Sequence, residues 1–119
     1  MTIPNFVQAD LNLKISNNPR LEVITLSELT YFGGNILIEG NGQLVSFVLP
    51  KMGYMKSGAS MTIRNSASLE SLSFPALSCG YVATFILENN PILVNVTIPT
   101  GCSFMFTSIN NPGLKFNEI

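Results

Sequence analysis

The chain has 119 residues, of which 46% are hydrophobic and only 11% are charged, with a formal net charge of −1. This length fits one domain, residues 1–119, that can bury its own core, and the absence of a basic stripe or an acidic tail argues against nucleic-acid binding. No apolar run approaches the ~20 residues of a membrane-spanning helix, so we expect no membrane insertion, and no signal peptide is visible.

One phrase recurs along the chain: an aliphatic residue, an asparagine-rich turn, then Leu-x-x-apolar-x-apolar, often followed by proline. In chain order the copies are LKISNNPRLEVITL, LIEGNGQLVSFVLP, TIRNSASLESLSFP, ILENNPILVNVTIP and TSINNPGLKFNEI. The leucines after the turns are 23, 25, 24 and 21 residues apart, at Leu21, Leu44, Leu69, Leu93 and Leu114. Such a period, with no helical periodicity, predicts an all-β repeat solenoid similar to a parallel β-helix, with about five coils of 21–25 residues.

Each copy contains two short predicted strands, one before the asparagine turn and one after the leucine. The first strand includes residues 13–15 and 61–63, and the second includes the segments VITL, SFVL, SLSF and NVTI. Alternation of apolar residues predicts two inward columns. The first column contains Ile15, Ile38, Ile63 and Leu87, and the second contains Leu26, Leu49, Phe74, Ile98 and Ile119. Stacked coils place the members of a column ~4.8 Å apart, which builds a core that no single coil can bury.

The turn between the two strands repeats one polar position. Asn17, Asn65, Asn89 and Asn110 occupy it, and Gly40 replaces asparagine once. Both residue types tolerate left-handed backbone. Stacked in register, the four asparagines are expected to form a structural ladder of side-chain hydrogen bonds.

The final copy departs from the pattern. Ser108 stands where an inward aliphatic residue is expected, and Asn117 falls in the column of Ile24, Phe47, Leu72 and Val96. Either a local bulge turns Ile109 and Phe116 inward, or this coil is a softened end cap. At the other end of the chain, Ile3 is expected in the column of Ile119, so that one chain would continue the pattern where another stops.

The repeat as a whole resembles leucine-rich-type repeats, in particular those of receptor L-domains. The segments LSFPAL and VTIP are also similar to the repeats of bacterial surface leucine-rich proteins. This resemblance implies a β-solenoid and an extracellular or cell-surface role in binding, without catalysis.

Few residues suggest a catalytic or metal-binding site. The chain contains no histidine, which excludes His-based catalytic triads and His metal sites. Glu22 and Glu70 share a column two coils apart, with Val45 between them, and are interpreted as solvated carboxylates. We expect no enzymatic activity, no cofactor and no metal.

Two pairs of alternatives concern covalent modification. Cys79 and Cys102 occupy corresponding loops of neighbouring coils, where they form either a disulfide or two independent buried thiols. Asn95 begins the triplet Asn-Val-Thr, which is either a glycosylation site or a chance occurrence in an asparagine-rich chain.

The outward apolar positions suggest a partner. A possible partner patch contains Leu37, Val45, Val48, Ile86 and Val94; alternatively, the loops 31–35 and 51–60 fold over these residues. We therefore expect a structural module that self-associates through solenoid ends or sheet faces, head-to-tail into a filament. The alternative is a recognition module that binds protein or glycan on an exposed strand face.

Overall fold

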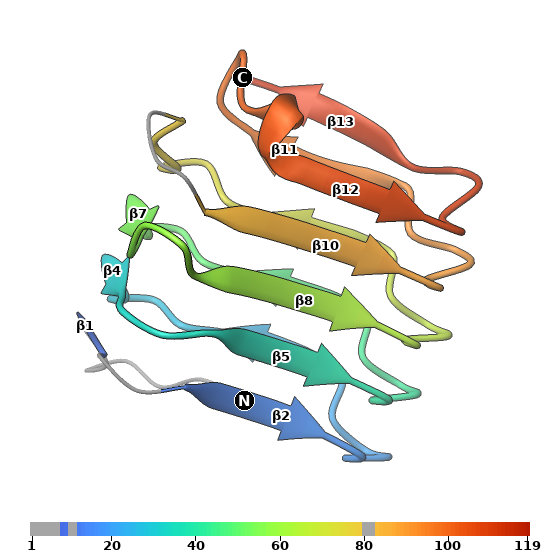
Figure 1. Ribbon diagram of the computed structural model, residues 1–119. Helices are drawn as coiled ribbons and strands as arrows, with labels where there is room; N and C mark the ends of the chain where they lie inside the picture. The colour runs from blue at the N-terminus through green and yellow to red at the C-terminus, as the bar shows by residue number, and fades with distance from the viewer. Residues whose placement is uncertain (1–7, 10–11, 80–82) are drawn as a thin grey trace.

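The computed structural model describes residues 8–9, 12–79 and 83–119. The chain winds into an all-β solenoid of about four turns (Figure 1). The predicted fold class is thus confirmed, although five strands per sheet amount to about four full turns rather than five. No helix in the described ranges is long and apolar enough to cross a membrane.

Three parallel sheets form the walls of the solenoid. The first, which we call the β2–β12 sheet, contains β2 (Leu13–Ser16), β5 (Ile36–Glu39), β8 (Ser60–Arg64), β10 (Thr84–Glu88) and β12 (Phe106–Ile109). The second, the β3–β13 sheet, contains β3 (Val23–Thr25), β6 (Ser46–Val48), β9 (Ser71–Ser73), β11 (Asn95–Ile98) and β13 (Lys115–Glu118). A short third sheet contains β1 (Gln8–Ala9), β4 (Tyr31–Phe32) and β7 (Tyr54–Met55), and a 3-10 helix, η1 (Ser103–Met105), precedes β12.

The register of the strands confirms the first inward column. Ile15 pairs with Ile38, Ile38 with Ile63, and Ile63 with Leu87, each one coil further along. These side chains face the interior between the two large sheets, and all four are buried. Because each residue contacts its equivalents above and below, the core runs through the stack without a break.

The last strand is shifted by one residue against the prediction. Phe116 pairs with Val96 and Asn117 pairs with Thr97, so placing Asn117 in the inward column was wrong. The reason is a shorter turn: Val96 is the third residue after Leu93, whereas Phe116 is the second after Leu114.

The same shift affects the end of the chain. Glu118 pairs with Ile98, so Ile119 lies one position beyond the predicted column and is 61% exposed. Ile109 pairs with Glu88 and is also exposed, so the bulge that was to turn Ile109 inward does not occur. Ile3 lies outside the described residues.

Candidate functional site

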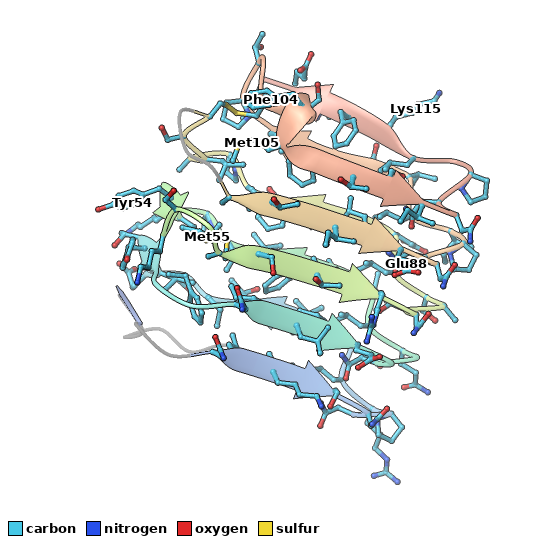
Figure 2. The ribbon with its side chains drawn as sticks, viewed as in Figure 1. Tyr54, Met55, Glu88, Phe104, Met105 and Lys115 are labelled. Carbon is cyan, nitrogen blue, oxygen red and sulfur yellow. A yellow bond between two sulfur atoms is a disulfide. The ribbon has the colours of Figure 1, made fainter. Side chains whose placement is uncertain are left out.

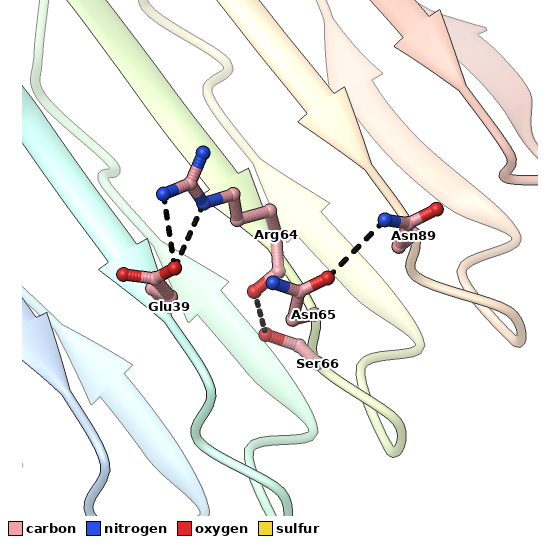
Figure 3. Close-up of polar contacts among 5 residues, drawn as sticks. All are labelled: Glu39, Arg64, Asn65, Ser66 and Asn89. Atoms are coloured by element: carbon pink, nitrogen blue, oxygen red, sulfur yellow. Dashed lines mark hydrogen bonds and ion pairs between the residues drawn. The ribbon is translucent and has the colours of Figure 1, made fainter.

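The asparagine turns line one corner of the solenoid in a left-handed conformation. The backbone angle φ of Asn17, Asn65, Asn89 and Asn110 is 54° to 57°, and φ of Gly40 is 66°. Side-chain amides connect three of these exposed residues. Asn110 Nδ2 donates to Asn89 Oδ1 at 2.9 Å. Asn89 Nδ2 in turn donates to Asn65 Oδ1 at 3.3 Å, as Figure 3 shows. Gly40 has no side chain and therefore separates Asn17 from this series. We call the four asparagines together with Gly40 the exposed column.

A second polar column, one residue further along each turn, was missed in the sequence. It contains Asn18, Asn41, Ser66, Asn90 and Asn111, and all but Asn18 are buried. We call it the buried column. No signal from composition distinguishes it from the exposed column, but the recurring doublet Asn-Asn-Pro shows that two neighbouring polar positions repeat.

The buried column satisfies backbone groups between coils. Asn90 Nδ2 donates to the Ile63 carbonyl at 3.1 Å, while Asn90 Oδ1 accepts the Ser66 N–H at 3.2 Å. Asn111 repeats both bonds one coil later, with the Leu87 carbonyl at 2.7 Å and the Asn90 N–H at 3.0 Å. Each asparagine thus receives the N–H of the equivalent residue in the preceding coil. This arrangement holds the corner together because buried backbone groups require hydrogen-bond partners.

The two large sheets present different outer faces. On the β2–β12 sheet, Arg64 pairs with Glu39 through Nη2 at 3.0 Å and Nε at 3.0 Å (Figure 3). Glu88 lies next to Arg64 in register. The β3–β13 sheet has two outward columns. One is uncharged and consists of Thr25, Val48, Ser73, Thr97 and Asn117, and the other carries a single charge, at Lys115, after Val23, Ser46, Ser71 and Asn95.

The residues of the predicted partner patch do not lie on one surface. Leu37 and Ile86 belong to one outward column of the β2–β12 sheet, on either side of Thr62. Val48 belongs to the β3–β13 sheet, and Val45 and Val94 lie in the turns that lead into that sheet. The loops expected to cover them instead contribute Tyr31–Phe32 and Tyr54–Met55 to the third sheet, where Tyr54 points outward and Met55 inward (Figure 2).

The carboxylates of Glu22 and Glu70 are placed as the sequence predicts. The Val45 N–H bonds to the Glu22 carbonyl and the Glu70 N–H bonds to the Val45 carbonyl, so Val45 lies between them. Both glutamates are exposed at the margin of the β3–β13 face. Among the described residues, no three His, Cys, Asp or Glu side chains gather where they could hold one metal ion.

A disulfide joins Cys79 and Cys102, with 5.2 Å between their Cα atoms. The two residues lie in the loops that follow β9 and β11, so the bond links neighbouring coils at the corner opposite the asparagines. Cys102 is fully buried, whereas Phe104, two residues later, is 71% exposed (Figure 2).

The two ends of the described solenoid both present apolar side chains. At one end, β12 and β13 are paired on one side only within the described residues, and Phe106, Leu114 and Phe116 are only partly buried. At the other end, an open hollow of about 400 Å³ is lined by Ile15, Asn18, Pro19, Arg20 and Leu21.

Comparisons with protein-family models, with curated proteins and with solved structures find no match. The fold is a β-solenoid. The surfaces described above offer strand edges, side-chain amides and apolar contacts.

Proposed function

We propose that the chain is a non-catalytic assembly module that self-associates head-to-tail through the ends of its solenoid. The observation that carries the proposal is the buried column, which begins at Asn18 in the first coil and reaches Asn111 in the last. A second copy stacked on the β12–β13 end would continue this column without a change of pattern.

The hydrogen bonds of the buried column have a direction. The Asn18 N–H donates to Asn41 Oδ1 at 3.0 Å, and the Asn90 N–H donates to Asn111 Oδ1 at 3.0 Å. The next acceptor in the series, for the Asn111 N–H, would come from the asparagine of a further coil. In a second copy stacked on this end, Asn18 Oδ1 would be that acceptor.

The apolar columns match across the same junction. Register extended by one coil places Leu13 of a second copy against Phe106, its Leu21 against Leu114, and its Ile24 against Phe116. Phe106, Leu114 and Phe116 are only partly buried at the open end. Stacking would remove this apolar area from water and would pair the edge backbone groups.

Head-to-tail stacking uses two different surfaces of each copy, so the contact is heterologous. Such a contact grows into a filament unless the rotation between copies closes a ring. In a longer chain, a further coil would occupy the same edge as a second copy. Association is therefore tested on the 119-residue chain.

The test is a proline on the open edge of β12. The Ile109 carbonyl accepts the Asn89 N–H, so alternation turns the Ser108 N–H away from β10 and toward the open edge. Ser108→Pro therefore removes an edge donor without breaking a bond to β10. Ser108→Ala is the matched control, because both variants lose the contact between Ser108 Oγ and Asn111 Nδ2.

Light scattering of concentrated protein measures the outcome. The wild type and Ser108→Ala are expected to show a mass that rises with concentration, and Ser108→Pro is expected to stay monomeric with an unchanged circular dichroism spectrum. A monomeric wild type would overturn the proposal, as would equal association by Ser108→Pro.

A second candidate function is recognition of protein or glycan on an exposed strand face. The uncharged outer column of the β3–β13 sheet favours it, as does the resemblance to receptor L-domains, which would place the chain outside the cell or at its surface. Screening the chain on glycan and protein arrays tests this candidate. Binding that survives Ser108→Pro would assign recognition to the face, and no binding to any class would reject it.

A further inference from the structure

Asn95 lies where a covalent modification could be carried without disturbing the fold. The sequence contains one Asn-x-Ser/Thr triplet, Asn95-Val96-Thr97. In the structure this triplet forms most of β11, with Asn95 exposed and Val96 fully buried. Alternation along the strand puts Asn95 and Thr97 on the same outer face.

The neighbours of Asn95 leave room on that face. In register, Asn95 lies between Ser71 of β9 and Lys115 of β13. Ser71 is small, and Lys115 is an exposed residue whose long side chain can swing aside. A substituent on Asn95 Nδ2 would therefore project from the β3–β13 face into solvent.

The disulfide is an independent observation that points to the same environment. Cys79 and Cys102 are bonded to each other, and disulfides persist in oxidising compartments, which include the secretory route where asparagine is glycosylated. The chain has no other cysteine. The disulfide therefore leaves no free thiol, which suits an oxidising compartment.

We propose that Asn95 is an N-glycosylation site and that it is modified before β11 joins the sheet. In the folded protein β11 is paired with β9 on one side and with β13 on the other. An enzyme that must bind both Asn95 and Thr97 cannot draw a strand paired on both sides out of its sheet. Modification therefore belongs to the newly made chain.

The transfer can be written in full. The amide nitrogen of Asn95 bonds to the anomeric carbon of an oligosaccharide, and the bond from that carbon to its lipid diphosphate carrier breaks. The lipid diphosphate leaves with the bonding electron pair, and one amide proton passes to a base of the transferase. The glycan would then cover the part of the β3–β13 face around β11 and leave the β2–β12 face open.

The test is translation with and without microsomes. The chain, preceded by a cleavable signal peptide, is expected to show one step of reduced gel mobility when it is made in their presence. Peptide N-glycosidase should remove that step. Thr97→Ser should keep it, whereas Thr97→Ala and Asn95→Gln should abolish it.

Two further measurements keep the result interpretable. Labelling of free thiols after import shows whether each variant has formed its disulfide and therefore folded. Peptide mass analysis of the imported wild type, after glycosidase treatment, should find aspartate at position 95. An imported, oxidised wild type with unmodified Asn95 would overturn the proposal, and so would efficient modification of protein that had folded before microsomes were added.

Discussion

The exposed and buried columns follow one another at the same corner, yet they stabilise the fold in different ways. The exposed column supplies backbone shape: four of its five members are asparagines with φ near 55° and the fifth is Gly40. The buried column supplies hydrogen bonds, through the amides of Asn41, Asn90 and Asn111. Asparagine thus has two roles at this corner, and the burial of its side chain distinguishes them.

The difference shows which substitutions each column accepts. Glycine replaces asparagine in the exposed column at Gly40, because glycine reaches positive φ without strain. Serine replaces asparagine in the buried column at Ser66, where the hydroxyl donates to the Arg64 carbonyl at 3.2 Å and the N–H bonds to Asn90. Every position of the exposed column holds a residue that adopts positive φ, and every position of the buried column holds a side chain that can form hydrogen bonds.

The largest effect on stability is expected at Leu69, the leucine that follows the turn of Asn65 and Ser66. Leu69 is fully buried, and Leu69→Ala should lower the free energy of unfolding by about 2–5 kcal/mol, since it removes packing from the middle of the stack. Urea denaturation measures the change.

The control for Leu69 is Lys14→Ala on the outer face of β2, which should cost under about 0.5 kcal/mol. Equal effects of the two variants would contradict the assignment of inward and outward columns.

Asn90→Ala should come next, at about 3 kcal/mol, because it leaves two buried groups, the Ser66 N–H and the Ile63 carbonyl, without their partner. Hydrogen exchange should also quicken at the Ser66 amide and in its neighbours. If Asn90→Ala costs no more than the equivalent change in the exposed column, the two columns do not differ as described.

Residue patterns were sufficient to predict the solenoid and the inner columns of every coil before the last one. Alternation at Ile15, Ile38, Ile63 and Leu87 is a local signal repeated four times, so a chance match is improbable and the register follows. The position of Asn117 could not be predicted in this way. Its register depends on the length of the preceding turn, which is one residue shorter in the last copy, and counting from Leu114 misplaces the strand.

The surfaces were harder to predict than the core. Outward alternation correctly makes Leu37 and Val48 outer residues, but it does not say that they lie on different sheets. The buried column escaped notice because asparagine is usually a surface residue, and only the bonds to the Ile63 and Leu87 carbonyls explain its burial.

Within the exposed column, Asn89→Ala should cost about 1–2 kcal/mol, because alanine does not favour φ of 56°. Asn89→Gly keeps the backbone shape and loses only solvent-exposed amide contacts, so it should cost under about 0.5 kcal/mol. Thermal unfolding of both variants separates shape from hydrogen bonding. A glycine variant as unstable as the alanine variant would show that the amide ladder itself stabilises this corner.

The smallest effect is expected at Gly40, the one break in the exposed column. Asparagine suits the φ of 66° found there. Its Cβ would meet Asn17 Oδ1 at 2.9 Å, but that atom ends a flexible side chain in solvent and can rotate away. A new amide between Asn17 and Asn65 would also join the two parts of the exposed column.

Gly40→Asn should therefore change stability by under about 0.5 kcal/mol in either direction, since the strain is small and the unfolded chain loses some of its freedom. Gly40→Ala meets the same oxygen and offers no amide, so it should cost about 1–2 kcal/mol at this φ. Urea denaturation of both variants beside the wild type makes the comparison. If asparagine proves as costly as alanine, the space beside Asn17 requires glycine at position 40, and Asn17 cannot be joined to the amide series of Asn65, Asn89 and Asn110.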